Sequence, residues 1–231
     1  DNDYGEEVRL KYRYLDLRRS KMQHNIKLRN NIINFVREFM NNEGFMELAT
    51  PILTAPSPEG ARDYLVPSRI HKGYFYALPQ APQQFKQLYM ASGVDKYFQI
   101  APCFRDEDSR ADRSPGEFYQ IDMEMSFATQ EDILDVISRL LFDTFDKFKS
   151  KEKSINKLPF PTFTYRDSIE NFGCDKPDLR NPLRLTNVTR YFEGSGLQIF
   201  ENLIKKGAIV NCIQALKSEG KPRSFYDNLN K

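Results

Sequence analysis

The hydrophobic pattern of the chain is most regular between residues 97 and 127, where it predicts a β-hairpin closed by a charged loop. The return segment sets two groups of residues on opposite faces: Tyr119, Ile121, Met123 and Met125 on one, and Phe118, Gln120, Asp122 and Glu124 on the other. In the incoming segment Phe98, Ile100 and Phe104 fall together, and Pro102 suggests a bulge or a strand end. We therefore expect one apolar face in the core and one polar face.

The loop of this hairpin is unusually rich in charge. Three arginines and four acidic residues lie between Arg105 and Arg113, which an ordinary hairpin does not need. Charged loops mostly lie at the surface and require no function. The polar face favours a function, because Phe118 places an aromatic ring beside three hydrogen-bonding side chains. Such a surface suits a bound ligand that is planar and polar.

Helical periodicity predicts three helices, at about residues 21–42, 80–92 and 131–148. Gly44 marks the end of the first helix, and Thr129 caps the third. The first helix carries two apolar stripes: Leu28, Ile32, Phe35 and Phe39, and Ile26, Ile33, Val36 and Met40. An apolar band this wide exceeds one packing surface, so the helix is either deeply buried in its own domain or meets a partner subunit.

Lys86 lies in the first turns of the second helix, which Pro82 opens, and so close to the positive end of the helix dipole. A lysine in that position most often reaches solvent. The alternative is that it awaits an anion. Short strands are predicted before this helix, at about residues 45–53 and within 62–78, with a turn at 71–73.

Composition places the chain among soluble globular proteins. Of its 231 residues, 40% are hydrophobic and 29% charged, and the net charge is +2, so any nucleic-acid contact must be a local patch. Three widely spaced cysteines fit a reducing cytosol better than a disulfide framework or a zinc site. No apolar run is long enough to span a membrane, and residues 1–20 are too charged for a signal peptide. The start without methionine suggests a fragment.

The two ends of the chain differ from its centre. Residues 9–19 are basic and aromatic, which indicates either a linker with its charges in water or an RNA-facing patch. Residues 183–231 mix short helical and strand-like pieces with charges, and we expect them to begin a separate, incomplete domain after the first domain at 1–182.

Elimination narrows the chemistry of the site. The sequence contains no glycine-rich phosphate loop, and its two histidines, His24 and His71, lie far from the polar cluster. A histidine-dependent triad or a zinc enzyme is therefore disfavoured. The remaining arginine, lysine, glutamine and carboxylate side chains suit the joint binding of carboxylate and phosphate, because guanidinium groups bind both groups bidentately.

Several segments closely resemble bacterial-type aspartyl-tRNA synthetases: Tyr12–Arg19, Pro58–Arg69, Phe75–Gln87, and Cys103–Asp108 through Gln120–Asp122. The resemblance covers nearly the whole chain. It implies an α+β class II synthetase catalytic core, an antiparallel β-sheet flanked by helices, of which this chain holds an incomplete part. Residues 1–182 would hold its motifs 1 and 2, and 183–231 would begin an α/β insertion domain. The helix and strand at 21–51 would form a homodimer contact.

The resemblance also implies roles for single residues. Arg105, in motif 2, would hold the α-carboxylate of aspartate and the α-phosphate of ATP, and is the one catalytic residue implied. The aspartate pocket would comprise Glu59, Gln83, Lys86, Arg105 and Gln120, with Glu59 and Gln120 on the ammonium and Gln83 and Lys86 on the side-chain carboxylate. The ATP site would comprise Arg105, Asp106, Glu107, Ser114 and Phe118, with Phe118 stacked on adenine. No metal ligand is expected in this segment.

The implied activity is ATP-dependent ligation of aspartate to tRNA(Asp) in the cytoplasm, with Mg²⁺ as cofactor, and the sequence leaves open whether tRNA(Asn) is also a substrate. Two departures from the family pattern concern the pocket: Ala81 stands where many relatives have serine, and Ser114–Glu117 replaces a shorter Gln-Pro-Glu. The alternatives are a synthetase for asparagine or lysine, or a synthetase-like module that binds nucleotide or dimerises without catalysis. Lys86 beside Gln83 argues for an acidic substrate.

Overall fold

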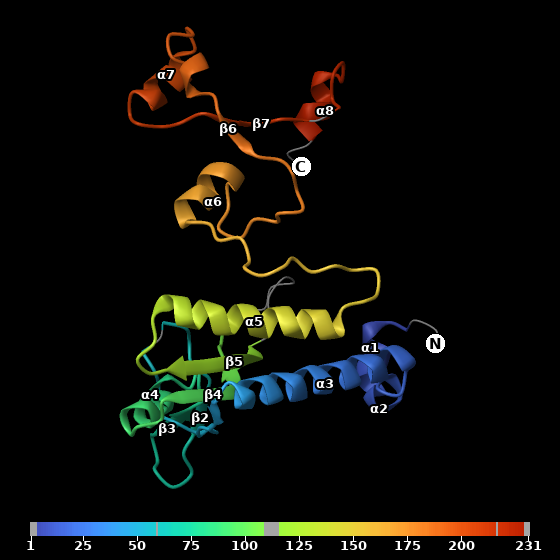
Figure 1. Ribbon diagram of the computed structural model, residues 1–231, viewed down its shortest axis with the longest axis vertical. Coiled ribbons are helices and arrows are strands. Elements are labelled where there is room, and N and C mark those ends of the chain that lie inside the picture. Colours follow the sequence, from blue (N-terminus) through green and yellow to red (C-terminus); the bar gives the residue numbers. More distant parts are fainter. Residues whose placement is uncertain (1–3, 59, 109–115, 216, 229–231) are drawn as a thin grey trace. The chain divides into compact units, whose positions relative to one another are not determined.

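A computed structural model of the chain describes residues 4–58, 60–108, 116–215 and 217–228 (Figure 1). The chain divides into two compact units, residues 1–160 and 161–231. The division after Phe160 comes earlier than the domain boundary expected at residue 182. The assignment of the C-terminal part to the start of an insertion domain stays a prediction.

The first unit contains the three expected helices and the hairpin. Its elements are α1 (Glu6–Lys11), α2 (Arg13–Asp16), α3 (Ser20–Asn42), β1 (Met46–Glu47), β2 (Leu65–Pro67), β3 (Phe75–Ala77), α4 (Gln83–Ala91), β4 (Lys96–Phe104), β5 (Glu117–Met125) and α5 (Gln130–Phe148). The predicted local signals hold. Gly44 follows α3 with a φ of 82°, and Thr129 caps α5 in a reciprocal bond with Asp132. The helix expected at 80–92 begins later, at Gln83, with Pro82 as its N-cap residue.

The second unit is built from shorter elements. These are α6 (Tyr165–Phe172), β6 (Leu185–Asn187), a 3₁₀ turn η1 (Thr189–Tyr191), α7 (Gln198–Ile204), β7 (Asn211–Ile213) and α8 (Arg223–Asn228). Strands β6 and β7 pair antiparallel over three residues each. In the portions of both units that the structure describes, no helix has the length and apolar character to cross a membrane.

The central sheet of the first unit has the strand order β1-β4-β5. Strands β4 and β5 form the expected antiparallel hairpin, whereas β1 lies parallel to β4 and pairs with it at Tyr97 and Phe98. Pro102 lies within β4 opposite Tyr119, so the bulge or strand end suggested at this residue is wrong. The proline is tolerated because the described pairing with β1 has already ended at Phe98.

One face of the hairpin packs against α3 and α5 (Figure 1). Six buried residues form the core: Val36 and Met40 of α3, Phe45 just after that helix, Phe98 of β4, and Val136 and Leu140 of α5. Met123 and Met125 of β5 pack against it, as predicted. Tyr119 and Ile121 lie on the same face of β5, but they are 53% and 48% exposed, so their expected place in the core is wrong.

The exposed end of this face forms an apolar groove with α3. Tyr119, Ile121 and Ile100 line a cavity of about 360 Å³ together with the α3 residues Leu28, Ile32 and Ile33. Arg29 covers the Tyr119 ring at 5.0 Å from its centroid. The two apolar stripes of α3 are thus used differently, because Val36 and Met40 complete the core while the N-terminal half of the helix leaves apolar surface open.

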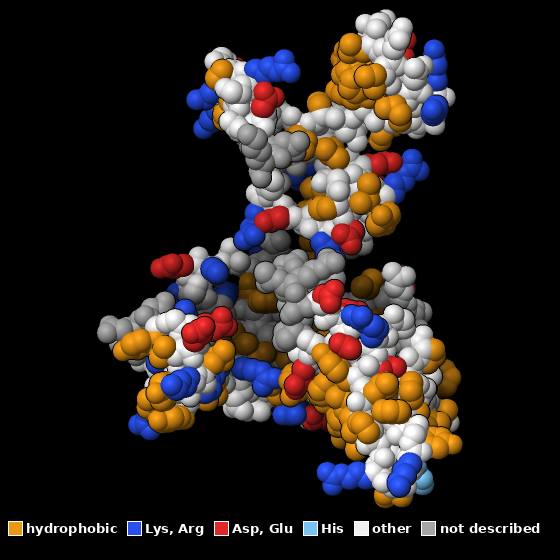
Figure 2. Space-filling view, turned by 180° about the vertical axis from the view of Figure 1, so that it is seen from behind, with side chains coloured by type: hydrophobic (Ala, Val, Ile, Leu, Met, Phe, Trp, Pro, Cys, Tyr) orange, Lys and Arg blue, Asp and Glu red, His pale blue; other side chains and the backbone are white. Residues whose placement is uncertain are grey.

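Further apolar side chains are exposed over β2, β3 and α4. Figure 2 shows them gathered at the end of the first unit that holds these elements. The residues are Leu65, Ile70, Tyr74, Phe75 and Leu88. Contiguous apolar surface of this kind indicates contact with another molecule or with chain outside the described residues.

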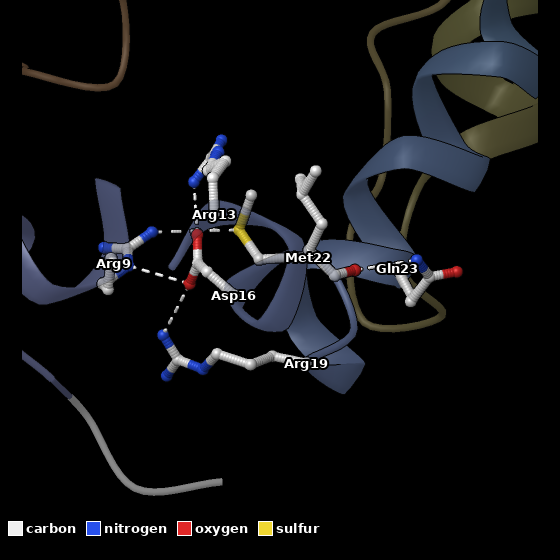
Figure 3. A network of polar contacts seen from close by, with 7 residues as sticks. Arg9, Arg13, Asp16, Arg19, Met22 and Gln23 are labelled. Carbon is white, nitrogen blue, oxygen red and sulfur yellow. Dashed lines mark hydrogen bonds and ion pairs between the residues drawn. The ribbon is translucent and has the colours of Figure 1, made fainter. Parts of the chain in front are cut away.

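The N-terminal helices are organised by one buried carboxylate (Figure 3). Asp16 is 5% exposed and accepts hydrogen bonds from Arg9 Nε at 2.9 Å, from Arg13 and from Arg19 Nη1 at 3.3 Å. Arg9 belongs to α1, Arg13 to α2, and Arg19 is the N-cap residue of α3. The charges of residues 9–19 are therefore not all in water, and the linker interpretation is incomplete. The RNA-facing alternative stays a prediction.

Truncation of Met40 measures the contribution of the core. Met40 of α3 is fully buried in the core that this helix forms with β4 and α5. Met40→Ala is therefore expected to lower the free energy of unfolding by about 2–5 kcal/mol. Met46→Ala is the matched control, because Met46 is 54% exposed and its loss should cost far less. Denaturant unfolding measures the loss of free energy of unfolding in both variants. Equal losses would mean that Met40 is not a core residue.

Acid titration tests the Asp16 cluster. Hydrogen bonding from Arg9, followed by that from Arg19 and the charges of Arg9 and Arg13, keeps the pKa of Asp16 below its usual value, although burial opposes this. A carboxyl group with a lowered folded pKa stabilises the fold above its unfolded pKa of about 3.9. That stabilisation disappears as the pH falls through the folded pKa. Asp16→Asn should therefore lower the melting temperature at pH 7.

The difference in melting temperature between Asp16→Asn and wild type should then become smaller as the pH falls below about 4 and the wild-type carboxyl group takes up a proton. Asp146→Asn is the control, because Asp146 pairs with Lys149 on an exposed part of α5 and should change little. Melting temperatures at a series of pH values decide the question. A difference that is constant with pH would mean that the charge of Asp16 is not what holds the helices.

Candidate functional site

The polar face of the hairpin brings together most of the expected site residues that the structure describes. Gln99 pairs with Asp122 and Ala101 with Gln120, so alternate residues of both strands share this face. From β5 these are Phe118, Gln120, Asp122 and Glu124, and from β4 they are Tyr97, Gln99, Ala101 and Cys103. Helix α4 contacts both strands. Because the other face packs on α3 and α5, the site lies on the side of the sheet away from the core.

Lys86, in the second turn of α4, is held by two carboxylates of β5. Its Nζ atom lies 2.8 Å from Asp122 Oδ1 and 2.8 Å from Glu124 Oε1. The side chain of Lys86 is only 9% exposed. The common outcome, a lysine that reaches solvent, is therefore wrong for this residue. The lysine does meet anions, but these two come from the chain itself.

The charge balance around Lys86 differs from that of a free cation. Burial lowers the pKa of Lys86, but hydrogen bonds and charges from Asp122 and Glu124 outweigh this, so that its pKa is raised and the ammonium stays charged at neutral pH. Two carboxylates around one ammonium carry a net charge of −1. The two bonds use two of the three N–H donors of the ammonium, which leaves a third for another acceptor.

Two acceptor oxygens lie beside this ion cluster. Asp122 Oδ2 is buried and has no hydrogen-bond partner within the described part of the chain. Gln120 Oε1 accepts a weak hydrogen bond from Cys103 Sγ at 3.4 Å and keeps a second lone pair. A buried carboxylate oxygen without a donor is unfavourable, so a ligand or water that donates a hydrogen bond is expected at this oxygen.

Arg105 follows β4 directly and closes the other end of this face. Its backbone N–H donates to Gly116 O at 2.7 Å, and its guanidinium lies over the Phe118 ring, 5.0 Å from the centroid. Phe118 is the expected adenine platform. A purine would therefore have to stack on the opposite side of the ring or displace Arg105.

Arg105 and Lys86 lie on the same side of the sheet, because they contact Phe118 and Asp122, which share a face of β5. These two β5 residues are four positions apart, which corresponds to about 13 Å of strand. Gln120 lies between them. A small molecule bound at Gln120 would therefore have a cationic side chain on either side of it along the strand.

Two further residues lie at the start of α4 and just before it. Gln83 begins the helix one turn before Lys86, so both project from the same side of it. Gln80 is 1% exposed and donates to Ala61 O at 2.9 Å and to Asp63 Oδ1 at 2.5 Å. Gln80, which the sequence did not single out, therefore fixes the segment that follows Glu59.

The segment after Arg105 is hydrogen-bonded to the segment that follows Glu59. Asp106 N–H donates to Arg62 O at 2.9 Å, and Arg62 Nε donates back to Asp106 O at 2.8 Å. The side chains of Asp106 and Glu107 are exposed. The expected contact of Glu107 with a nucleotide is compatible with this exposure but is not tested by it.

Gly116 marks a close approach of the chain. A β-carbon at this position would overlap the Tyr64 hydroxyl and would lie 2.9 Å from Arg105 O. The glycine that the sequence adds to the loop is thus required by packing against β2 and its flanking residues. Ala81, the other departure, is half-buried immediately before Pro82, and nothing in the structure explains why it is alanine here.

Two of the expected site residues, Glu59 and Ser114, lie outside the described residues, so their positions are not assigned. Within the described ranges, no group of three or more His, Cys, Asp or Glu side chains is arranged to hold a metal ion. The nearest carboxylate pair, Asp122 and Glu124, is already engaged by Lys86.

Sequence reasoning did not single out two members of the site, Tyr97 and Gln99, and it placed Glu124 on the ligand-binding face without a specific role. Alternation in the incoming strand was the available signal, because Tyr97 and Gln99 fall opposite Phe98 and Ile100. A buried tyrosine at the end of an apolar strand is typical of a core, however. Its polar neighbours become visible only through the strand register.

Comparison with known families identifies the chain. The model described as "tRNA synthetases class II (D, K and N)" matches residues 5–219. The chain is 61% identical over 98% of its length to an aspartate–tRNA(Asp/Asn) ligase of Ehrlichia canis (strain Jake), and 57% identical over its whole length to one of Pelagibacter ubique (strain HTCC1062). It spans 38% and 39% of the length of these relatives.

A solved structure supports the fold. A crystal structure assigned as an aspartyl-tRNA synthetase from Leishmania major Friedlin matches 64% of this chain with a TM-score of 0.55 and 26% sequence identity. The match covers 28% of that protein. The α+β arrangement, with its central hairpin and flanking helices, is thus the class II synthetase arrangement expected from the sequence.

Proposed function

From the premise that the chain belongs to the class II tRNA synthetases of the D, K and N group, we propose that it is the part of an aspartate–tRNA ligase that binds and activates L-aspartate with ATP. The chain spans less than two fifths of the length of its Ehrlichia and Pelagibacter relatives. The activity is therefore proposed for the full-length protein that contains this segment, and the segment supplies part of its site.

The observation that carries the proposal is the arrangement of charge along one face of β5. Arg105 lies at one end over Phe118, Lys86 lies at the other on Asp122 and Glu124, and Gln120 separates them. Aspartate has two carboxylates and one ammonium, so it needs two cationic contacts and at least one acceptor. This face carries both cations and the acceptors on one side of the sheet.

Each group of the amino acid has a candidate partner. The side-chain carboxylate accepts the third N–H of Lys86, with Gln83 beside it on α4. The ammonium binds between Gln120 Oε1 and the unpaired Asp122 Oδ2, where the net negative charge of the cluster favours a cation. Glu59 is proposed as a further contact to the ammonium. The α-carboxylate then faces Arg105.

Activation needs no protein nucleophile in this arrangement. An oxygen of the α-carboxylate attacks the α-phosphorus of ATP, the bond to the β-phosphate breaks, and pyrophosphate leaves behind aspartyl-adenylate. A hydroxyl of the 3′-terminal adenosine of the tRNA then attacks the carbonyl carbon, and AMP leaves. Arg105 would hold carboxylate and α-phosphate together and neutralise charge that develops between them, so catalysis rests on positioning and electrostatics.

The nucleotide contacts follow from the same motif. Phe118 would stack on adenine, and Glu107 would accept from the adenine amino group, with Asp106 and Ser114 nearby in the loop. Mg²⁺ would accompany the ATP phosphates when the nucleotide is bound.

We also propose that the full-length protein is a cytoplasmic homodimer that joins through the helix and strand at residues 21–51. The open apolar groove between α3 and the Tyr119 end of β5 supports this contact, because a partner would remove its apolar lining from water. The tRNA partners would be tRNA(Asp) and, as in the relatives named for both, tRNA(Asn).

Pyrophosphate exchange tests the activity. A full-length protein containing this chain should incorporate labelled pyrophosphate into ATP in the presence of aspartate, and not with asparagine or lysine. Exchange that depends on asparagine or lysine would identify another member of the group. ATP binding without exchange for any of the three would favour a non-catalytic module.

Replacement of Lys86 tests the substrate assignment. Lys86→Ala removes the ammonium that the side-chain carboxylate would contact and leaves two carboxylates without their cation. We expect the KM for aspartate to rise by about 10- to 100-fold, while the KM for ATP changes by less than about threefold. Steady-state exchange kinetics provide both constants, and equal changes in them would show that Lys86 does not select the amino acid.

Lys96→Ala is the matched control for this variant. Lys96 begins β4 in the same hairpin, but it lies on the other face, where its Nζ donates to Glu43 O at 2.9 Å. Its removal should leave both KM values near wild type.

A further inference from the structure

A second polar layer lies beneath the ion cluster of Lys86. Tyr97 is fully buried, and its hydroxyl donates to Gln99 Oε1 at 2.8 Å. Thr50 Oγ1 donates to the same oxygen at 3.0 Å. Gln99 is only 7% exposed, so this small network is shielded from water.

The strand register places this layer directly against the two carboxylates that hold Lys86. Tyr97 pairs across the hairpin with Glu124, and Gln99 pairs with Asp122. Cross-strand partners on one face have their β-carbons about 4.5–5.5 Å apart, which brings their side chains into contact. The pairing of β4 with β5 therefore places this layer next to the ion cluster.

Electrostatics support a direct influence of these carboxylates on the Tyr97 hydroxyl. Burial raises the pKa of Tyr97 most strongly, the nearby Asp122 carboxylate raises it further, and Glu124 contributes less. The hydroxyl therefore remains protonated at neutral pH and acts as a hydrogen-bond donor. Asp122 Oδ2, which lacks a partner in the described chain, is an acceptor on the same face.

The Tyr97 ring also supports the helix that carries Lys86. Tyr89, one turn after Lys86 on α4, stacks on Tyr97 with ring centroids 6.1 Å apart. The Tyr89 hydroxyl points elsewhere and donates to Ala49 O at 3.0 Å. Helix α4 is thus fixed to the hairpin at two points, by Tyr89 on Tyr97 and by Lys86 on its carboxylates.

We propose that Tyr97 is a positioning residue for recognition of the acidic substrate side chain. Its hydroxyl, which donates to the same Gln99 Oε1 atom that Thr50 binds, keeps Asp122 and Glu124 in the orientation that presents the third N–H of Lys86 to the substrate. The inference rests on the proposed function and deepens it, because it assigns part of aspartate selection to a residue that does not touch aspartate.

A purely structural role would not require the hydroxyl. Stacking on Tyr89 needs only the ring, and phenylalanine provides the same ring without a buried polar group that must find partners. The hydroxyl makes its contacts among the polar groups under Lys86. Its removal should therefore disturb substrate selection more than the fold.

Tyr97→Phe in the full-length protein tests the inference by aspartate-dependent pyrophosphate exchange. We expect the KM for aspartate to rise by about five- to thirtyfold and the preference for aspartate over asparagine to fall by a similar factor. The KM for ATP and the kcat should stay within about twofold. Tyr89→Phe removes a hydroxyl from the stacked partner ring and should leave all constants near wild type.

A second pair of variants covers the case in which Tyr97→Phe does not fold. Thr50→Val removes the hydroxyl that holds Gln99 and should raise the KM for aspartate selectively, whereas Thr50→Ser keeps that hydroxyl and should restore it. Unchanged aspartate KM values in Tyr97→Phe, or in Thr50→Val where the former does not fold, overturn the inference, as does a parallel loss toward ATP.

The wild-type measurement separates the two proposals. If the wild-type protein shows no aspartate-dependent exchange, the proposed function fails and the inference fails with it. If wild type is active and Tyr97→Phe behaves like Tyr89→Phe, the function stands and only the role of Tyr97 is rejected.

Discussion

The structure of the first unit depends on the burial of one lysine ammonium between two carboxylates of β5. An isolated ammonium with 9% exposure would be very unfavourable, and removal of a partner from a buried ion cluster typically costs about 3–5 kcal/mol. Lys86 therefore determines where α4 docks, since the helix can approach the hairpin only where Asp122 and Glu124 are available. The stacking of Tyr89 on Tyr97 then fixes the rotation of the same helix. Gln83, one turn before Lys86 on α4, inherits its position from this contact.

The same ion cluster also changes which ligands Lys86 can bind. A bare cation would attract any anion, whereas an ammonium shared by two carboxylates carries a local net charge of −1 and one remaining donor. Such a group does not bind a lone carboxylate strongly. In the proposed site it suits a zwitterion, whose ammonium would be drawn to the negative cluster and whose carboxylates would lie between Lys86 and Arg105. Selectivity would then come from the fixed geometry of several charges, and for this reason we expect residues that only orient the cluster to affect it.

The sequence predicted the elements that depend on local chemistry. The capping of α5 by Thr129, the end of α3 at Gly44 and the alternation in β5 follow from side chains near each other in the chain, and the structure confirms them. The elements that depend on distant neighbours were less accessible. Tyr119 and Ile121 looked like core residues because nothing in the pattern shows that α3 and α5 cover only one end of the hairpin. Likewise, the network of Thr50, Gln99 and Tyr97 joins residues 49 positions apart at most in the sequence, and no periodicity reports it. Family resemblance supplied roles for Arg105 and Lys86, but not the carboxylates that hold Lys86.

The two faces of the hairpin are coupled by the two-residue period of a strand. Shifting β5 by one residue against β4 would move Asp122 and Glu124 to the core side and Met123 and Met125 to the substrate side. The register is therefore held from both sides at once: burial of Phe98, Met123 and Met125 against α3 and α5 is favourable only in the register that also places both carboxylates under Lys86. Stability and substrate geometry thus depend on one register. A core substitution that loosens the packing of β5 should weaken the definition of the ion cluster before it unfolds the unit, because that register sets the positions of both carboxylates and their contact with the polar layer of Tyr97 and Gln99.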